Sequence, residues 1–587
     1  MITLKKLYFD PNPKNITPII FDRGINFIIG ERSKSITNQS ENKKMNGVGK
    51  SISIEMINYC LMKDFKKNRV SKIPEPVLPS DISICLDLEI ETPKSITNIT
   101  IKRFPTEHSP IIIIEDHVST ELKGIEEAKK YLDSLFNKDN EDEITERPSL
   151  RSMLSLLIRD ERTSYDNVLY PYPESSLNKF GEIIKPHLYF FDFDLSLVDK
   201  IKKIDKFIEE TKKVISSLKR NIKDEGINPK DLDIYLNELR DKVEKLNFSI
   251  EELKPGEGIN QAREELTKLE GQIRKLTSEK VSRDYSVKQI KNLPKLEKVN
   301  SDEVKEIYNQ FKGGLGDLVQ KSLDQVQLFQ SEIENFHRQL MEEKLNALNE
   351  EISTLDIQIE LLNNQISRIY SQYKSSEEVH ALRDAITQFQ EKNRKLEMLT
   401  SVFSILKDKN DTLKVNARSR SKLLEKLDAQ IISLNKRTLS FKNDLERAHQ
   451  YIAGNKACHF DIEISEKGKE FIIFDYRIKL DGSSGINRIK TFIYDALLML
   501  NNYTSKKHLG FLIHDNIFAS VGKDDMVQAL NYLNGELARL NKFQYILTIN
   551  KDEFDSCVNK FDFDYKQKTR AIFTRKDPFL KEEYPEV

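Results

Sequence analysis

The stretch from Gly30 to Ser51, GERSKSITNQSENKKMNGVGKS, decides the fold because its last six residues look like the end of a phosphate-binding loop. The full pattern, G-x-x-x-x-G-K-[ST], needs a glycine at position 44, but this chain has Lys44 there. The nearest earlier glycine is Gly30, 14 residues further back (44 − 30). A phosphate loop surrounds its ligand with backbone N–H groups, and it adds a lysine for the β- and γ-phosphates and a hydroxyl for Mg²⁺.

The surroundings of this motif favour a phosphate site that carries an insertion. The strand-like run INFIIG precedes the motif and the helix-like run GKSISIEMINYCLM follows it, as the chemistry requires. The polar segment between Gly30 and Met45 reads as a flexible insertion, and a longer loop of this kind adds little closure entropy. The alternative is a surface loop that only mimics the motif. The residues predicted to hold the nucleotide are Asn46, Gly47, Val48, Gly49, Lys50 and Ser51, and Ser51 is also a predicted Mg²⁺ ligand.

The composition of the 587-residue chain indicates long solvated helices and more than one domain. Charged residues make up 32% of the chain but the net charge is −1, so any contact with nucleic acid must come from local basic patches. The four cysteines are far apart and form no C-x-x-C pair, which argues against a disulfide framework or a zinc hook. No apolar run approaches the roughly 18 residues of a membrane span, so we expect a cytoplasmic protein without a membrane segment.

From about residue 195 the apolar residues recur in steps of three and four, which is the heptad pattern of a coiled coil. One clear series is Leu345, Leu348, Ile352, Leu355, Ile359, Leu362 and Ile366. The longest interruption, residues 293–316, contains Pro294, Gly313, Gly314 and Gly316. We therefore expect an outgoing arm, a turn and a returning arm that form an antiparallel intramolecular coiled coil. The alternative is a bundle of ordinary amphipathic helices.

Strand-rich segments flank this helical region, so we expect the two chain ends to complete one α/β head. The N-terminal end contains the strand-like runs ITLKKLYFD and DISICLDLEIE, and the C-terminal end contains LGFLIHD and FQYILTIN. The predicted boundaries are 1–194 for the N-terminal half of the head, 195–292 for the outgoing arm, 293–318 for the turn, 319–453 for the returning arm and 454–587 for the C-terminal half of the head.

The segment LGFLIHDN places Asp515 at the end of a hydrophobic strand, where a Walker B aspartate reaches the Mg²⁺ shell. His514 and Asn516 flank it and complete the candidate catalytic set, with the role of His514 left open. An asparagine cannot accept a proton as a glutamate does, so we expect hydrolysis to be slow, to use another carboxylate or to be absent. The alternative is that any buried strand can end in an aspartate.

The segment DGSSGINRIKTFIYDALLML places Ser483, Ser484 and Gly485 at the start of an amphipathic helix. Small residues with exposed N–H groups at a helix N-terminus form an anion site. This start is therefore a candidate signature motif that closes over the γ-phosphate held by a second subunit. The alternative is an ordinary helix cap built from serine and glycine.

The order of these features resembles the head domains of SMC/RecF/RecN-type ABC ATPases over essentially the whole chain. The runs RGINFIIGERS…NGVGKS, FLIHDNIF and QYILTIN are closer still to the SMC-like ATPases of bacterial three-component ABC systems and Lamassu-type defence operons. The resemblance implies an α/β ABC-type ATPase head with a long antiparallel coiled coil, and ATP and Mg²⁺ as cofactors. It assigns Lys50 and Ser51 to ATP and Mg²⁺, Asp515 to Mg²⁺, and residues 483–485 to the opposite nucleotide of a head-to-head homodimer.

The resemblance further implies double-stranded DNA as a ligand and partner subunits from the same operon, often an effector nuclease, in defence against phage or plasmid DNA. This chain departs from the family at three points. The first glycine of the loop is displaced, Asn516 stands where the catalytic glutamate is expected, and LTINKD offers Ile549 or Asn550 in place of a switch histidine. These departures bear on turnover more than on ATP binding.

Basic clusters at residues 63–72, 212–220 and 416–422 are candidate contacts for DNA phosphates, and the alternative for the helical ones is a solvated helix face. Lys66, Lys67 and Arg69 lie in the first cluster, and Arg418, Arg420 and Lys422 in the last. Two rival functions remain at this stage. One is DNA repair in the manner of RecN, and the other is a structural coiled-coil scaffold with a degenerate nucleotide site.

Overall fold

The computed structural model describes residues 1–31, 48–92, 95–107, 109–137, 147–160, 171–172, 180–252, 260–291, 323–372, 377–465, 471–479, 482–555 and 557–582. The chain divides into two units. The first, called the head below, comprises Met1–Lys203 and Arg420–Val587, and the second, called the helical unit, comprises Ile204–Ser419.

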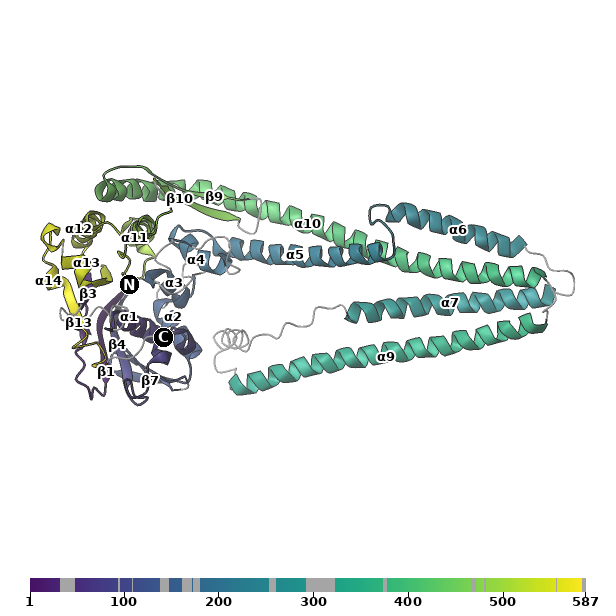
Figure 1. The fold of residues 1–587 in the computed structure, drawn as a ribbon, viewed down its shortest axis with the longest axis horizontal. Helices are drawn as coiled ribbons and strands as arrows, with labels where there is room; N and C mark the ends of the chain where they lie inside the picture. Colours follow the sequence, from purple (N-terminus) through teal and green to yellow (C-terminus); the bar gives the residue numbers. More distant parts are fainter. Residues whose placement is uncertain are drawn as a thin grey trace, which may run out of the picture. The chain divides into compact units, whose positions relative to one another are not determined.

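A parallel sheet in the head joins the two ends of the chain (Figure 1). Its described strands follow the order β13-β3-β12-β11-β8 and are all parallel to their neighbours. Their bounds are β3 Gly24–Glu31, β8 Ile158–Arg159, β11 Phe511–Asp515, β12 Gln544–Asn550 and β13 Thr569–Thr574. β3 pairs with β12 from Gly24 opposite Gln544 to Gly30 opposite Asn550. The expected meeting of the two chain ends in one α/β head is therefore confirmed.

The second sheet of the head is antiparallel and comes from the N-terminal part of the chain. Its order is β2-β1-β4-β5-β6-β7, with bounds Ile19–Ile20, Ile2–Asp10, Ser83–Glu91, Ile96–Arg103, Ile111–Glu115 and Val118–Leu122. A hairpin of β9 (Cys458–Ile464) and β10 (Ile472–Ile478) forms a third sheet among the described strands. Alternation of buried and exposed residues along β4 and β5 matches a sheet with one face in the core.

Helix α1 (Lys50–Cys60) contacts strands of both large sheets, so it lies in the middle of the head. Nine of its 11 residues are buried, including the polar Ser53, Glu55 and Asn58. A helix that is buried on all sides must satisfy such groups internally, which is why they carry the polar contacts described below. The other described α-helices of the head are α2 Ile125–Asn137, α3 Leu150–Leu157, α4 Phe180–Phe190, α11 Ser484–Leu500, α12 Lys523–Leu540, α13 Lys551–Asp555 and α14 Tyr565–Lys568. Short 3₁₀ turns lie at Phe65–Lys67, Arg69–Lys72, Thr504–Lys506 and Val558–Lys560.

Two long helices begin or end in the head. Val198 and Ile201 of α5 (Leu195–Asp224) and Phe441 and Leu445 of α10 (Glu377–Ala453) are buried in the same apolar core. The segments near residues 195 and 450 therefore share one core, as an antiparallel insertion requires. With the parallel sheet that joins the two chain ends, this agrees with the predicted architecture, an α/β head built from both ends of the chain with a long helical insertion between its halves.

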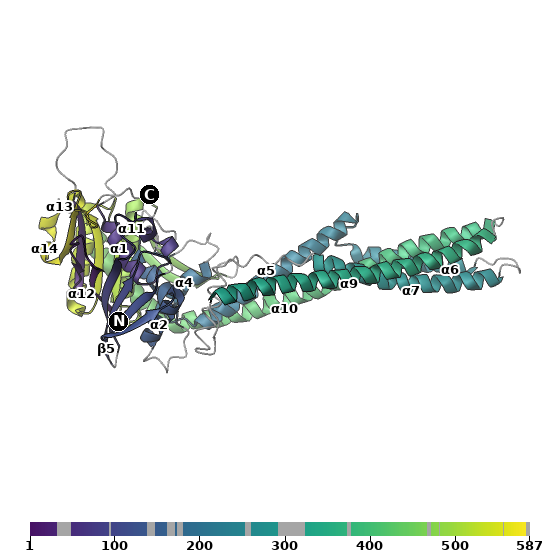
Figure 2. The same ribbon diagram turned by 90° about the horizontal axis from the view of Figure 1, so that it is seen from below.

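The helical unit contains α6 (Leu232–Glu252), α7 (Asn260–Lys291) and α9 (Leu323–Gln372), with parts of α5 and α10. Ion pairs join Lys280 to Asp356 and Arg283 to Glu351, so α7 and α9 pack antiparallel, as Figures 1 and 2 show. Among the described residues, one apolar cluster takes side chains from four helices: Val243, Ile250, Leu266, Ile273, Ile366, Ile386 and Phe389. The sequence predicted one outgoing and one returning arm, with a helix bundle as the alternative, whereas four helices share this core. Heptad spacing identifies the apolar face of each helix, but it does not state how many helices meet. The expected turn at 293–318 lies outside the described residues.

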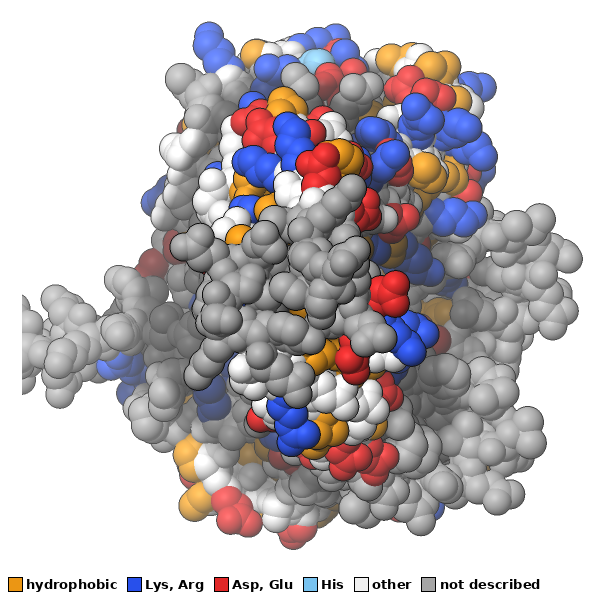
Figure 3. Space-filling model, turned by 90° about the vertical axis from the view of Figure 1, so that its right-hand side faces the viewer, with side chains coloured by type: hydrophobic (Ala, Val, Ile, Leu, Met, Phe, Trp, Pro, Cys, Tyr) orange, Lys and Arg blue, Asp and Glu red, His pale blue; other side chains and the backbone are white. Residues whose placement is uncertain are grey.

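The face of the molecule drawn in Figure 3 carries charges of both signs. In the space-filling view (Figure 3), basic, acidic and apolar side chains are interspersed, with several Lys and Arg side chains together at the upper right. Within the described residues, no helix combines the length and the apolarity that a membrane crossing requires.

Candidate nucleotide and metal site

The carboxyl ends of four parallel strands meet along one edge of the central sheet. β3 ends at Glu31, β12 at Asn550 and β11 at Asp515. β8 pairs with β11 so that Arg159 lies opposite His514, which puts Asp160 one residue further on, level with Asp515. In open parallel sheets, ligands bind outside the carboxyl ends of the strands. This edge is therefore where a site is expected.

Gly49 and Lys50 form the end of the phosphate-loop motif and begin α1. Gly49 caps the helix with φ 96°, a left-handed conformation that favours glycine, and a Cβ there would come within 2.5 Å of Phe579 Cβ. Lys50 is the first residue of α1, and its side chain lies against Gly30, where an added Cβ would come within 2.6 Å of the Lys50 Cδ atom. The glycine displaced 14 residues upstream therefore makes room for the lysine. Val48 is buried beside Gly49, and Asn46 and Gly47 lie outside the described residues.

The ammonium group of Lys50 lies at the sheet edge, where its Nζ donates to the side-chain oxygen of Asn550. Asn550 also donates from its Nδ2 to Glu553 Oε1 at 3.2 Å. In the sequence, Asn550 is notable only as one of two residues at the position expected for a switch histidine. In the structure it is the residue that holds the motif lysine at the end of β12.

Asp515 is buried, and both Thr548 and Ser51 act on its carboxylate as hydrogen-bond donors. Burial, and after it the negative charge of Asp160, raises the pKa of Asp515 to about 6, while the bonds from Thr548 and Ser51 act in the opposite direction. The structure thus brings Ser51 and Asp515 together, although 463 residues separate them in the sequence (515 − 51 − 1). A hydroxyl and a carboxylate side by side are the oxygen ligands that Mg²⁺ prefers.

Asn516 directly follows the strand and has a left-handed backbone with φ 56°. Its N–H donates to the Thr548 carbonyl at 3.2 Å and to Thr548 Oγ1 at 3.0 Å, and its carbonyl accepts from Arg488 Nη1 at 2.8 Å. Asparagine tolerates this backbone conformation better than most residues do. The contacts hold the loop after β11, but the amide side chain has no basic oxygen that takes up a proton.

His514 lies on the opposite face of β11 from Asp515, because successive side chains of a strand alternate. It is 0% exposed; Nδ1 lies 3.1 Å from the Tyr545 hydroxyl and Nε2 lies 3.0 Å from Asp495 Oδ2. Burial lowers its pKa despite the neighbouring carboxylate of Asp495. Because both ring nitrogens are engaged in the interior, we leave His514 out of the proposed catalytic set.

A buried ion pair between Arg159 and Asp495 lies next to the strand ends that form this sheet edge. Arg159 of β8 contacts the carboxylate of Asp495 through Nε and through Nη2, the latter at 2.6 Å, and both side chains are 2% exposed or less. Asp495 belongs to α11, so it connects that helix to Arg159 of β8 and to His514 of β11. The residues that follow these two in the sequence are Asp160 and Asp515. The ion pair therefore connects α11 to β8 and β11 and stabilises the ends of these two strands.

The candidate signature residues stand at the start of α11. Ser483 caps the helix by accepting from the Ile486 N–H at 3.3 Å, and Ser484 is the first helical residue. Both serines are exposed. A Cβ on Gly485 would collide with the backbone oxygen of Ser520, so a glycine is needed where α11 touches the loop after Asn516. The capping role expected as the alternative is present for Ser483.

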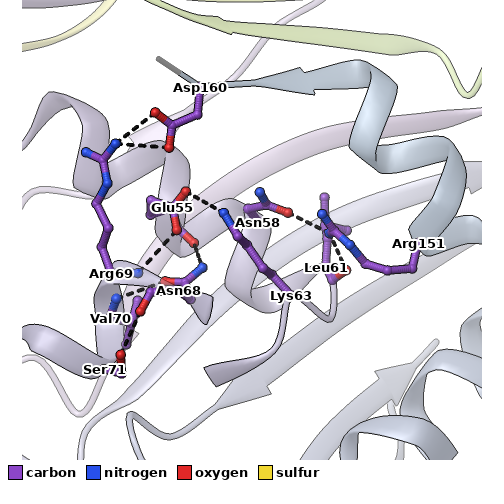
Figure 4. Close-up of polar contacts among 10 residues, drawn as sticks. All are labelled: Glu55, Asn58, Leu61, Lys63, Asn68, Arg69, Val70, Ser71, Arg151 and Asp160. Atoms are coloured by element: carbon purple, nitrogen blue, oxygen red, sulfur yellow. Dashed lines mark hydrogen bonds and ion pairs between the residues drawn. The ribbon is translucent and has the colours of Figure 1, made fainter. Parts of the chain in front are cut away.

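Four charged residues near the site were not recognised from the sequence as a group (Figure 4). Glu55 lies one turn after Ser51 on α1; its carboxylate accepts from Lys63 Nζ at 2.9 Å and from the Arg69 N–H at 3.3 Å. The Arg69 guanidinium contacts both oxygens of Asp160 at 2.8 and 3.0 Å. Lys63 and Arg69 belong to the basic cluster predicted to contact DNA. In the structure, however, their side chains pair with the buried carboxylates of Glu55 and Asp160. A glutamate within the apolar run ISIEMI was the available signal for a buried charge network.

Comparisons with known proteins identify a family model, a relative and a solved structure that are similar to this chain. Residues 441–583 match the family described as "Uncharacterised protein conserved in bacteria (DUF2326)". The chain is similar to the Bacillus subtilis (strain 168) protein named "Uncharacterized protein YydD", with 23% identity over 564 residues that cover 90% of each chain. It is also similar to the crystal structure of the Smc head domain with a coiled coil and joint derived from Pyrococcus yayanosii, with 12% identity, a TM-score of 0.33, and coverage of 96% of this chain and 94% of that chain.

Proposed function

We propose that this chain is an SMC-like ATPase that binds Mg²⁺–ATP at the carboxyl edge of its parallel sheet and engages a second copy through its head. The observation that carries the proposal is the contact of Ser51 with Asp515 beside Lys50, because these residues come from opposite ends of the chain. In this proposal Lys50 and the first N–H groups of α1 hold the phosphates, and Ser51 and Asp515 hold the metal. Bound Mg²⁺ would supply positive charge against the phosphate oxygens.

The donor set fits a magnesium ion. Asp515 is a buried carboxylate whose charged form is disfavoured by burial and by the charge of Asp160. A divalent cation at this position would offset both effects, and the hydroxyl of Ser51 lies beside the carboxylate. Burial together with a neighbouring carboxylate is therefore what we expect around an aspartate that binds a cation. An aspartate with only a structural role at a strand end would need neither.

Mg²⁺-dependent ATP binding tests the proposal. Titration of the full chain with a fluorescent ATP analogue is expected to show tighter binding with Mg²⁺ than with EDTA. Ser51→Ala removes one proposed metal ligand, so it is expected to weaken binding about tenfold in Mg²⁺ and to leave binding in EDTA unchanged. Even the loss of a residue that only hydrogen-bonds to a metal ligand typically costs about 10- to 100-fold in metal affinity. A wild-type chain that binds no analogue in Mg²⁺ would contradict the proposal.

We infer in addition that DNA contacts the helical unit along α5. This helix carries nine basic and five acidic residues, whereas α6 carries three basic and six acidic ones. Lys212, Lys219 and Arg220 of α5 are exposed. Basic side chains of this kind bind DNA phosphates without sequence preference, and the affinity falls as salt rises.

Neutralising the triad Lys212, Lys219 and Arg220 to alanine is expected to weaken binding of a DNA duplex about tenfold at 100 mM salt. It should also reduce the slope of log affinity against log salt by about 2 to 3, because each lost phosphate contact removes roughly one counterion. The matched control is Arg240, Lys242 and Lys245 to alanine, three exposed residues on the acidic helix α6. Equal effects of the two triads would contradict a contact along α5.

The more specific role, control of a partner effector subunit in bacterial defence against phage or plasmid DNA, is supported by the motif resemblance. We infer that such subunits are encoded beside this chain. Co-purification of the products of neighbouring genes with the full chain, with and without ATP and DNA, tests this role. A chain that purifies alone under all four conditions would favour the repair-type alternative.

A further inference from the structure

Asn550 and Glu553 lie side by side where β12 passes into α13. Asn550 is the last residue of β12, and Glu553 is the third residue of α13. The register of β12 with β3 puts Asn550 opposite Gly30, the glycine against which the Lys50 side chain packs. Both residues therefore belong to the corner of the sheet edge that holds the motif lysine, and the proposed function assigns neither of them a role.

The position of Glu553 is set by the packing of α13 against β3. The next residue, Phe554, is 0% exposed, and its ring meets that of Phe27 of β3 edge-on, with 5.0 Å between the ring centroids. At the start of α13, Lys551 pairs with Glu31 at the end of β3 at 2.6 Å. One apolar contact and one ion pair thus fix this short helix to the strand that leads into the phosphate-loop motif.

The contacts of Asn550 define which way its side-chain amide points. Its Nδ2 donates to Glu553 Oε1 at 3.2 Å, and its Oδ1 accepts from the Lys50 ammonium. An ionised carboxylate only accepts hydrogen bonds and an ammonium only donates them, so both neighbours select the same orientation of the amide. The second oxygen of Glu553, Oε2, is buried and has no hydrogen-bond partner within the described residues. A buried acceptor of this kind costs stability, so the stability of the fold does not explain a glutamate here.

We propose that Asn550 and Glu553 are positioning residues for the motif lysine. Glu553 orients the amide of Asn550, and Asn550 fixes the Lys50 ammonium at the sheet edge before the nucleotide binds. This inference rests on the proposed function. A lysine side chain has large rotamer freedom, and its immobilisation during binding weakens affinity, whereas a lysine that is already fixed in the free protein loses less freedom. Both residues thus act on nucleotide affinity through Lys50 rather than through contact with the phosphates.

Four variants of the full chain test this role: Asn550→Ala, Glu553→Ala, Glu553→Gln, and Asp555→Asn as a control at an exposed residue of the same helix. Equilibrium binding of a fluorescent ATP analogue with Mg²⁺ is measured on each. Asn550→Ala is expected to weaken binding about tenfold, the scale of one long side chain that must be immobilised on binding. Glu553→Ala is expected to weaken it about fivefold. Glu553→Gln is expected to recover that loss to within about twofold of wild type, because an amide oxygen accepts the same bond from Asn550. The control is expected to match wild type.

The Asn550→Ala change in the Lys50→Ala background separates positioning from a structural effect. With no ammonium to position, this change is expected to alter affinity by less than about twofold. An equal loss in the two backgrounds would overturn the inference, as would a Glu553→Gln chain that binds as weakly as Glu553→Ala. A wild-type chain that binds no analogue would overturn the proposed function and this inference together. A wild-type chain that binds the analogue, beside an Asn550→Ala chain that binds it equally well, would overturn this inference alone.

Discussion

Lys50→Ala is expected to weaken Mg²⁺–ATP binding at least 100-fold and to abolish ATP-dependent association of two heads. In the proposed site the Lys50 ammonium binds the β- and γ-phosphates. In the structure this ammonium group contacts Asn550 at the sheet edge. Hydrogen bonds between charged partners contribute about 1.5–3 kcal/mol each, so losing two of them corresponds to roughly 100-fold or more in affinity. Truncation leaves the fold in place, because alanine is a favourable residue in the first turn of a helix.

Two measurements check this expectation. Titration with a fluorescent ATP analogue gives the affinity, and light scattering with Mg²⁺–ATP gives the molecular mass in solution. The control is Lys66→Ala, since the Lys66 side chain is 70% exposed and pairs with Glu107 at the surface. An Lys50→Ala chain that binds ATP within threefold of wild type would contradict the phosphate role of the motif. A mass that is unchanged by ATP in the wild type would favour the structural scaffold.

Arg159→Met is expected to lower the free energy of unfolding of the head by about 3–5 kcal/mol. Arg159 and Asp495 are buried together, and removal of one partner leaves an uncompensated charge in a medium of low dielectric constant. The loss reaches the site, because Asp495 also contacts His514, the residue before Asp515. Hydrogen exchange of the β11 amides as a function of urea measures the stability of the head itself, which a global transition of a chain with two units does not isolate.

A second variant separates the buried charge from the loss of packing. Arg159→Met combined with Asp495→Leu removes both charges, so we expect the double variant to recover part of the lost stability. The control is Lys102→Met, which breaks the more exposed pair with Asp10 and is expected to cost less than about 1 kcal/mol. If Arg159→Met costs no more than this control, the buried pair does not brace the strand ends. A double variant less stable than both single variants would also contradict the account.

Much of the site was predictable because its signals are local. Lys50 and Ser51 follow a strand and begin a helix, and Asp515 ends an apolar strand, and each of these patterns spans fewer than 15 residues. The alternation of β11 also contained the information that His514 and Asp515 point to opposite faces. Asp515 therefore contacts Thr548 at the sheet edge, whereas His514 contacts Tyr545 and Asp495 in the interior.

The ion pairs between basic and acidic residues were not predictable, because the local sequence does not specify which basic residue pairs with which acidic one. Lys63 and Arg69 read as members of a surface cluster, yet their partners, Glu55 and Asp160, lie 8 and 91 residues away. The level position of Asp160 beside Asp515 depends on the pairing of β8 with β11. Strand order and pairing are long-range properties, so neither could be derived from spacing alone.

The sequence by itself determined which segments are strands and helices, the face that each long helix buries, and the residue types able to hold a phosphate and a metal. Periodicity and residue chemistry are properties of neighbours along the chain, so they can be read before folding. Only the tertiary structure decided that Gly30 lies under Lys50, that four helices share one core among the described residues, and that Asp160 stands next to Asp515. The separations in sequence range from 20 residues for Gly30 and Lys50 (50 − 30) to 355 for Asp160 and Asp515 (515 − 160). Each of these arrangements depends on which surfaces meet, and that is decided by packing of the whole core rather than by any one segment.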